Sequence, residues 1–276
     1  MEYRISLTGD LGSGKSTVSK IISEKYGCEI YSTGKICRAI AASKGINDIK
    51  EMNLYMATHP EIDKEIDDGL VALSDKKGNL IVDSRMAWHF TRPTFKVYLS
   101  AAIDVAAERI FKDNRSGESY ASVEEMKKSN IERKSSENSR YFEMYGVNIY
   151  DMTNYDLIVD TTAMSANEAA EIISLGAEGK LDNNGYIYPA RLFPTKDIGE
   201  FEKQEGTPVI CCYNNNFYII SGHKKILEAI TEDEPYIICD IVKPTDISLY
   251  EDYSSSDYRE WFSELHRLGR REFTRY

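Results

Sequence analysis

The sequence predicts an α/β protein whose N-terminal part is a doubly wound, largely parallel sheet, and three observations support this class. Near-continuous apolar runs, typical of strands buried on both faces, occur at 80–83, 96–100 and 156–161, after a short β-branched run at 3–8 and a strand-like piece at 28–32. Helical patterns alternate with them, from Ser16 to about Tyr26, then to about Ser43, and again over 165–175. A glycine-rich loop joins the first strand directly to the first helix. Such alternation builds a doubly wound sheet.

Composition limits the function classes. The 276 residues are 42% hydrophobic and 29% charged, which suits a globular chain of two unequal domains. A net charge of −11 argues against a protein that coats duplex DNA or anionic membranes. No run is long and apolar enough for a membrane helix, and the first residues do not resemble a secretory signal. We therefore expect a cytoplasmic protein with no membrane partner and reduced cysteines.

The chain divides near residue 180. The stretch 176–185 is polar and rich in Gly and Asn, as expected of a linker. We predict a first domain at 1–178 and a smaller α+β domain at 186–276. In the second, the runs 207–213 and 217–222 flank three asparagines and predict a hairpin, followed by a short helix after Gly222 and a strand at 236–242.

The loop Gly9-Asp10-Leu11-Gly12-Ser13-Gly14-Lys15-Ser16 matches the phosphate-binding pattern G-x-x-x-x-G-K-[ST] in full, between a strand and a helix. Glycines let backbone N–H groups turn toward a phosphate, and the helix start adds a positive dipole end. Lys15 would reach the β/γ oxygens and Ser16 would ligate Mg²⁺. We expect ATP to be bound by Gly9, Gly12, Ser13, Gly14, Lys15, Ser16 and Thr17.

Asp83 ends the predicted strand 80–83, where a carboxylate would hold Mg²⁺ through water. The alternative is an aspartate that caps a turn.

Several further segments are each weak evidence alone, but their order and spacing along the chain are informative together. The segments are Ser32-Thr33-Gly34 with Arg38, 59–67, Asp83-Ser84-Arg85-Met86-Ala87, 132–148 and 155–161. Together they resemble the nucleoside monophosphate kinases, and among them the short, archaeal-type cytidylate kinases, over about residues 1–175. The resemblance implies Mg²⁺- and ATP-dependent phosphoryl transfer to a nucleoside monophosphate, with CMP or dCMP first. It places Thr33, Arg38 and Arg85 at the acceptor phosphate.

The segment from 104 to about 148 is long, charged and helical, with few apolar anchors, so we expect a mobile lid that stands off the sheet. Arg133 and Arg140 are seven apart and share one helix face. Two converging guanidiniums suit the transition state of phosphoryl transfer, and a closed lid excludes water. The alternative is a solvated helix paired with neighbouring glutamates. Arg109 is a further candidate for ATP binding.

Asp63 and Asp67 share a helix face at i, i+4. A carboxylate here, Asp63 in particular, would accept a hydrogen bond from the exocyclic amine of cytosine. A solvated acidic face is the alternative. Asp10 is a departure from the resemblance, and we expect its side chain to point outward from the phosphate loop. Ser84, where the family usually has glycine, makes the acceptor less certain than the reaction.

The second domain carries another resemblance. Residues 217–229, with Gly222-His223-Lys224-Lys225, and the upstream 191–195 resemble the ParB/sulfiredoxin-like fold. The sulfiredoxin nucleophile is absent, since Gly222 occupies its place. The helix start and two lysines suggest a phosphate site, with an ordinary helix start as alternative. We expect the domain to bind a phosphorylated small molecule such as a nucleotide, or a protein partner, and to be separable from an active kinase after about residue 180.

Two other functions stay open at this level. The same scaffold would serve a kinase of another acceptor, such as a modified nucleotide, a base in DNA or a small hydroxyl metabolite. A nucleotide-sensing regulator would use the kinase fold as a switch and the second domain as an interaction module. The paired lid arginines favour an enzyme.

Overall fold

Nine strands form one sheet in the computed structural model, which describes residues 2–46, 49–113, 120–201 and 205–276. The strand order is β2-β3-β1-β4-β5-β6-β9-β7-β8. The strands are β1 Arg4–Gly9, β2 Glu29–Ser32, β3 Leu80–Asp83, β4 Phe95–Ser100, β5 Leu157–Asp160, β6 Gly185–Ile187, β7 Val209–Tyr213, β8 Asn216–Ser221 and β9 Ile237–Val242. The first six pair in parallel, which confirms the predicted α/β class and the mostly parallel sheet.

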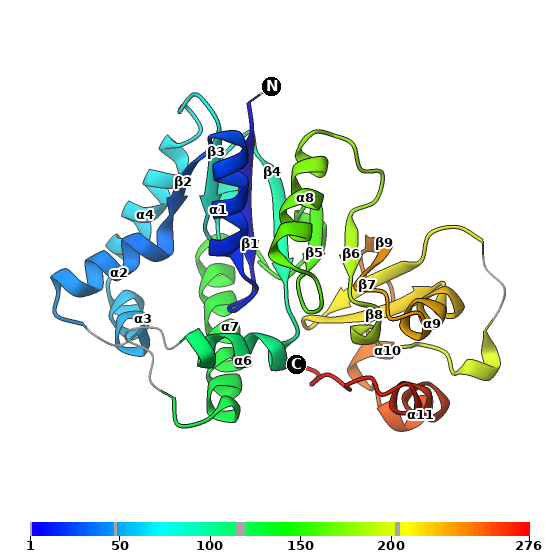
Figure 1. Cartoon of the computed structure of the whole chain (residues 1–276). Helices are drawn as coiled ribbons and strands as arrows, with labels where there is room; N and C mark the ends of the chain where they lie inside the picture. Colours follow the sequence, from blue (N-terminus) through cyan, green and yellow to red (C-terminus); the bar gives the residue numbers. More distant parts are fainter. Residues whose placement is uncertain (1, 47–48, 114–119, 202–204) are drawn as a thin grey trace.

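Helices cover both faces of the sheet (Figure 1). The α-helices of the N-terminal part are α1 Lys15–Tyr26, α2 Thr33–Ser43, α3 Ile49–Thr58, α4 Pro60–Ala72, α5 Ala87–Phe90, α6 Ile103–Asp113, α7 Val123–Tyr145 and α8 Ala166–Ala177. Those after β6 are α9 His223–Thr231, α10 Ser248–Glu251 and α11 Arg259–Arg267. Short 3-10 turns lie at Met152–Asn154 (η1), Pro189–Arg191 (η2), Ile198–Glu200 (η3) and Ser255–Tyr258 (η4). In the ranges described, none of these helices has the length and apolar character needed to cross a bilayer.

One face of the sheet packs on α1 and α8. Ile5 and Leu7 of β1 are fully buried there against Val18 and Ile22 of α1. Strands buried on both faces read as continuous apolar runs, which is why β1, β3, β4 and β5 were predictable from sequence.

The opposite face carries a core that continues into the C-terminal part. Leu70 of α4, Tyr98 of β4 and Ile158 of β5 belong to the same buried cluster as Ile219 of β8 and Trp261 of α11. The predicted hairpin is β7–β8, and its two-residue turn places Asn214 and Asn215 at positive φ (45° and 65°), as that turn requires.

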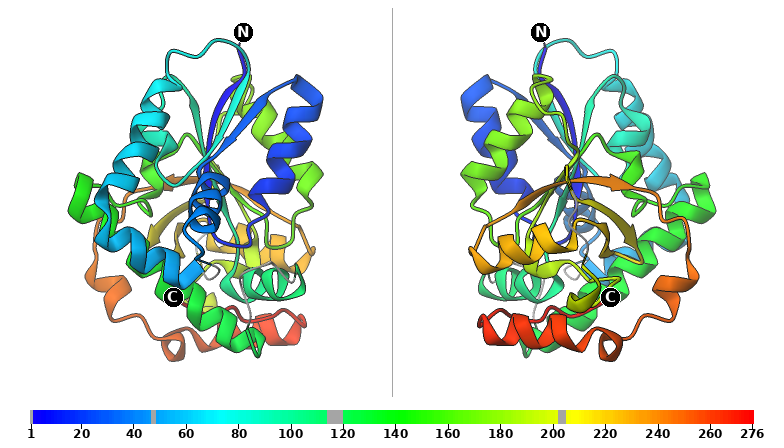
Figure 2. Two further views of the ribbon diagram at one scale, coloured as in Figure 1. Left: turned by 90° about the vertical axis from the view of Figure 1, so that its left-hand side faces the viewer. Right: turned by 90° about the vertical axis from the view of Figure 1, so that its right-hand side faces the viewer.

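The sheet itself runs across the predicted domain boundary. β6 pairs in parallel with β5 on one side and antiparallel with β9 on the other. Two views at right angles to Figure 1 show the C-terminal elements beside the lower end of the parallel strands (Figure 2). The division into 1–178 and 186–276 stays a prediction, but the two parts share a sheet and a core.

Candidate active site

A cavity of about 550 Å³ opens at the carboxyl edge of the parallel strands. The register of β1 with β3 sets Leu7 opposite Asp83, so the phosphate loop after β1 and the end of β3 lie side by side. The cavity is lined by that loop, by α2, α3, α4 and α7, and by residues after β3 and β5. Ligands of open α/β sheets bind at this edge, so the cavity is the candidate active site.

The phosphate loop has the backbone that its glycines permit. Gly9 lies at φ +152°, and a Cβ on it would come within 2.2 Å of the Leu99 carbonyl oxygen. Gly12 lies at φ +77°, and a Cβ there would come within 2.6 Å of the Ala106 carbonyl oxygen. Both positions therefore require glycine. The loop passes directly into α1, whose N-cap is Gly14.

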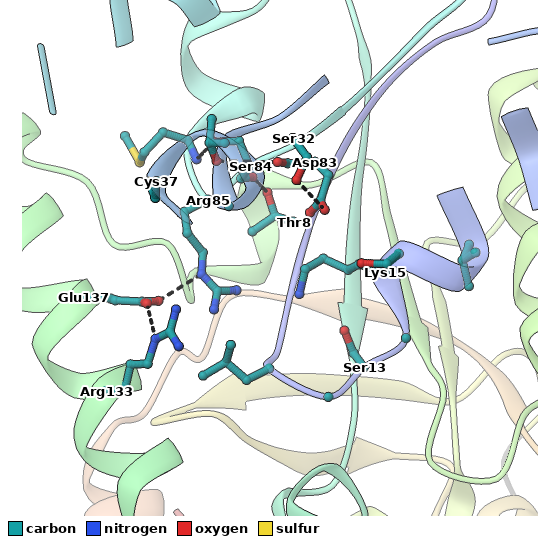
Figure 3. Close-up of a pocket in the computed structure, with 18 of the residues that line it drawn as sticks. Thr8, Ser13, Lys15, Ser32, Cys37, Asp83, Ser84, Arg85, Arg133 and Glu137 are labelled. Atoms are coloured by element: carbon teal, nitrogen blue, oxygen red, sulfur yellow. Dashed lines mark hydrogen bonds and ion pairs between the residues drawn. The ribbon is translucent and has the colours of Figure 1, made fainter. Parts of the chain in front are cut away.

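Lys15 lies across the loop that carries it. Its Nζ donates to the carbonyl oxygens of Gly9 at 2.8 Å and Asp10 at 2.7 Å. Burial, together with the positive charge of Arg85, lowers the pKa of Lys15 to about 7. An anionic phosphate placed at this amine would restore its charged form. Figure 3 shows the side chain pointing into the cavity between Asp83 and Arg85.

The residues predicted to hold Mg²⁺ both line this cavity. Ser16 is exposed in the first turn of α1, and Asp83 ends β3, where its carboxylate accepts a hydrogen bond from Ser32 Oγ at 3.3 Å. In the described ranges, no cluster of three or more His, Cys, Asp or Glu side chains could hold a metal. A hydroxyl and a carboxylate suit Mg²⁺, which keeps several waters and takes the rest of its oxygens from substrate phosphates.

Two arginines from different elements share one carboxylate. Glu137 of α7 accepts from Arg85 Nε at 2.9 Å and from Arg133 Nε at 2.8 Å (Figure 3). Burial would raise the pKa of Glu137, but Arg85 and Arg133 outweigh it and lower the pKa to about 2. Arg85 also donates to the carbonyl oxygen of Gly9. Glu137 thus fixes both guanidiniums beside the phosphate loop.

In the sequence, Glu137 lies in the predicted lid segment 132–148 and is one of the glutamates that would pair with an arginine on a solvated helix, so its burial between two arginines was not predicted. The available signal was its position four residues after Arg133, which predicts contact on a helix but not burial.

Arg140 lies further along α7, near the acidic face of α4. Its Nη2 is 3.9 Å from Asp63 Oδ1 and 3.4 Å from the hydroxyl of Tyr141. Burial raises the pKa of Asp63, and Arg140 partly offsets this. Asp67 accepts from the hydroxyl of Tyr145. Asp63 is buried at 6% exposure, so the alternative of a fully solvated face does not apply to it.

The remaining predicted residues are brought to the same cavity. Thr33 and Arg38 line it from α2, and Thr17 lines it from α1. Arg109 of α6 donates to the carbonyl oxygen of Thr161 at 2.6 Å and to that of Gly12 at 3.4 Å. Apart from Gly9, the candidates that the sequence singled out all line this one cavity, although their individual roles stay predictions.

Two expectations about this region were wrong. Asp10 does not point outward: its carboxylate is buried and accepts from Tyr98 Oη at 2.7 Å, from the amide of Ala101 at 3.0 Å and from Lys134 Nζ at 2.6 Å.

The helix α7 does not stand off the sheet, because Lys134 anchors it to the phosphate loop. Its buried face is mainly polar, comprising Met126, Asn130, Lys134 and Glu137, so hydrophobic periodicity did not reveal it. Residues 114–119 of the predicted lid lie outside the described part of the chain.

At the start of α9, where a phosphate site was predicted, His223 and Lys225 form hydrogen bonds with the backbone of neighbouring segments. His223 Nε2 accepts from the amide of Thr195 at 3.1 Å, and Lys225 Nζ donates to the carbonyl oxygen of Gly206 at 2.7 Å. Burial, with Lys196 nearby, lowers the pKa of His223 to about 4. These contacts favour a structural histidine over the predicted phosphate site.

The chain is similar to one protein-family model and to several cytidylate kinases. Residues 8–127 match a family model described as an AAA domain. A cytidylate kinase of Pyrococcus horikoshii is 37% identical over 170 residues, which cover 61% of this chain and 85% of the relative. A cytidylate kinase of Archaeoglobus fulgidus is 33% identical over 178 residues, which cover 64% of this chain and 96% of the relative.

One relative is much longer than the match. An S-adenosylmethionine-dependent nucleotide dehydratase of Lacinutrix mariniflava is 35% identical over 173 residues, but this chain spans only 35% of that protein. Among solved structures, a shikimate kinase from Bacteroides thetaiotaomicron has a TM-score of 0.44 at 15% identity, covering 64% of this chain and 99% of that one.

Proposed function

Since the chain belongs, over 61% of its length, to the family of cytidylate kinases within the P-loop kinases, we propose that it transfers the γ-phosphoryl group of ATP to CMP or dCMP. The observation that carries the proposal is the convergence of three cations from three elements on one cavity. Lys15 comes from the phosphate loop, Arg85 from the segment after β3 and Arg133 from α7. Phosphoryl transfer depends chiefly on such positioned charge.

In the proposed reaction an oxygen of the acceptor phosphate attacks the γ-phosphorus, and the bond to the β-phosphate oxygen breaks to release ADP. Lys15 and the loop amides hold the donor phosphates. Arg38 and Arg85 hold the acceptor phosphate, with Thr33 beside them. Arg133 and Arg140 stabilise the charge of the transferring group, while Glu137 orients Arg85 and Arg133. Helix α7 excludes water from the phosphates.

P-loop kinase homology implies Mg²⁺ with ATP. Ser16 and Asp83 fit this group, because both offer oxygen atoms to the cavity beside the phosphate loop. When bound, Mg²⁺ would neutralise charge on the β- and γ-phosphate oxygens. Arg109, near Gly12, would contact the nucleotide from the other side of the loop.

Asp63 supports cytosine as the base. It is a buried carboxylate that lines the acceptor side of the cavity, next to Arg140. A carboxylate accepts from the exocyclic amine of cytosine, whereas uracil presents an oxygen there. A site built to accept such a bond discriminates strongly against an analogue that lacks the donor.

The kinase assignment is tested by Lys15→Ala. We expect turnover to fall by about 10²–10³ or more, since a charge that interacts with the transferring group is lost. The readout is ADP release with ATP·Mg²⁺ and CMP. Lys20→Ala is the matched control, because Lys20 lies on the same helix with its side chain 74% exposed. Wild-type turnover in a folded Lys15→Ala protein would remove the assignment.

The acceptor is tested by a screen of CMP, dCMP, UMP, AMP and GMP. We expect CMP and dCMP to be preferred by kcat/KM, and Asp63→Asn to reduce the preference of CMP over UMP by about tenfold or more. Asp68→Asn, on the exposed side of α4, is the control. Equal use of UMP by the wild type would contradict the role of Asp63. Transfer to none of the five would direct the search to another acceptor.

For residues 186–276 we propose a ligand-binding or partner-binding role without chemistry of their own. The β7–β8 hairpin followed directly by α9 supports the ParB/sulfiredoxin-like resemblance. Titration of the full chain with CDP and ATP, followed by the chemical shifts or exchange rates of residues 217–229, tests the nucleotide part of this proposal.

A further inference from the structure

The carboxylate of Asp10, second residue of the phosphate loop, is the centre of a buried polar cluster. It is 4% exposed and accepts from Tyr98, Ser100, Ala101 and Lys134. Charge assistance from Lys134 helps to lower the pKa of Asp10 despite its burial. The carboxylate is thus an ionised acceptor held by four donors, which fixes its position within the fold.

The cluster is completed from the C-terminal part of the chain. Arg191, in η2 after β6, donates to Ser100 Oγ at 2.6 Å and pairs with Asp160 at 3.2 Å. Its side chain is 6% exposed and Asp160 is fully buried. Two cations, Lys134 and Arg191, therefore neutralise two buried carboxylates, Asp10 and Asp160. Removing one member would leave an uncompensated charge in the interior.

Tyr276 closes the cluster from the other side. Its ring centroid lies 4.2 Å from Lys134 Nζ, within the range of a cation–π contact. The amide of Tyr276 donates to Asn216 Oδ1 at 2.9 Å, which ties it to β8. Just before it, Thr274 Oγ1 donates to Asp104 of α6 at 2.9 Å. Figure 1 shows this last segment returning from α11 to the region of α6.

The same residues determine where the catalytic cations lie. Lys15 is aimed by the carbonyl oxygens of Gly9 and Asp10, so a shift of Asp10 moves the lysine with it. Lys134 adjoins Arg133 in α7 and fixes that helix against the loop. One buried cluster thus sets the separation between the phosphate loop and the guanidiniums of the helix.

We propose that Arg191 and Tyr276 are positioning residues for the kinase reaction: acting through Ser100, Lys134 and Asp10, they hold the phosphate loop and α7 at the catalytic separation. This rests on the proposed function and extends it to the C-terminal part of the chain. Neither residue touches the substrate cavity. Their effect is on turnover, since a misplacement of about 1 Å can cost on the order of a hundredfold in rate.

The test compares Tyr276→Ala with Tyr276→Phe in the full chain. We expect Tyr276→Ala to lower kcat by about tenfold or more with the KM for CMP little changed, and Tyr276→Phe, which keeps the ring, to stay within about twofold of wild type. Tyr213→Ala is the matched control, because Tyr213 is a tyrosine of the same part whose hydroxyl contacts Glu251, away from Asp10. Equal losses in Tyr276→Ala and Tyr213→Ala would overturn the proposal.

A second readout does not depend on turnover. Hydrogen–deuterium exchange at residues 9–16 should rise in Tyr276→Ala and remain unchanged in Tyr213→Ala. If Tyr276→Ala does not fold, Tyr276→Leu keeps most of the volume without the aromatic face, and Arg191→Lys keeps the charge without the fork. Unchanged exchange together with unchanged kcat would refute the positioning role. If the wild type transferred to no acceptor, the proposed function would fail, while exchange would still decide whether Tyr276 fixes the loop.

Discussion

The buried imidazole of His223 shows how a residue's surroundings decide its chemistry. A backbone amide can only donate, so Nε2 of His223 must accept from Thr195 and the ring is held neutral. Protonation would place the N–H of Nε2 against the N–H of Thr195, two donors facing each other in a buried site. His223 is therefore part of the packing of α9 against the segment that follows η2.

This predicts a pH dependence of stability. The pKa of His223 is about 4 in the fold and about 6.5 when unfolded. Above pH 6.5 the ring is neutral in both states, and its contribution to the free energy of unfolding is fully present. This contribution is lost as the pH falls from 6.5 to 4, because in that range the unfolded chain gains a proton and the folded chain does not. The loss amounts to about 3 kcal/mol at most. Urea unfolding across this range checks it.

His223→Asn removes the titrating ring but keeps an acceptor, so the slope between pH 6.5 and 4 should become shallower. His266→Asn serves as the control, since that side chain is 66% exposed. A slope unchanged by His223→Asn would contradict the explanation.

At the scale of elements, α7 illustrates a helix held by polar groups. Its buried positions follow helical spacing at 126, 130, 134 and 137, yet three of the four side chains are polar. Two of these polar side chains contact groups from distant segments: Lys134 donates to Asp10, and Glu137 accepts from Arg85. A buried polar stripe of this kind looks like a solvated face in the sequence, because the pattern depends on partners that lie elsewhere.

Helix α8 makes a simpler prediction. Ser165 accepts from the amide of Glu168, and Glu168 accepts in return from the amide of Ser165, which forms a capping box. Ser165→Ala should lower the free energy of unfolding by about 1 kcal/mol, since a helix-end donor loses its partner. Ser165→Asp keeps an acceptor and should lose much less. Equilibrium denaturation distinguishes the two, and equal stability of the Ala variant and wild type would argue against the cap.

At the scale of the whole molecule, the two predicted domains act as one packing unit. Asp160, at the end of β5, is fully buried and takes its countercharge from Arg191, beyond the predicted boundary. β6 covers the edge of β5 that would otherwise be open. The sequence favoured a kinase separable near residue 180, whereas these contacts lead us to expect that such a truncation exposes core and leaves Asp160 unpaired.

We therefore predict that a chain ending at residue 180 is destabilised by about 3 kcal/mol or more from the lost pair alone. Adding Asp160→Asn should recover part of this loss in the short chain and cost stability in the full chain. Thermal unfolding of the full chain and the short chain, each with and without Asp160→Asn, checks that the substitution stabilises the short chain and destabilises the full one. A short chain as stable as the full one would show that the parts are independent.

By itself the sequence determined the α/β class, the phosphate loop, the order of the kinase segments and the set of residues that meet in the cavity. These follow from local pattern: apolar runs, glycines with required backbone angles, and motifs in a fixed order. The tertiary structure alone decided the inward direction of Asp10, the burial of Lys134 and Glu137, and the pairing of Arg191 with Asp160. Lys134 and Asp10 are 124 positions apart, and Arg191 and Ser100 are 91 apart. Such contacts are set by how the sheet brings distant segments together, and no local pattern records them.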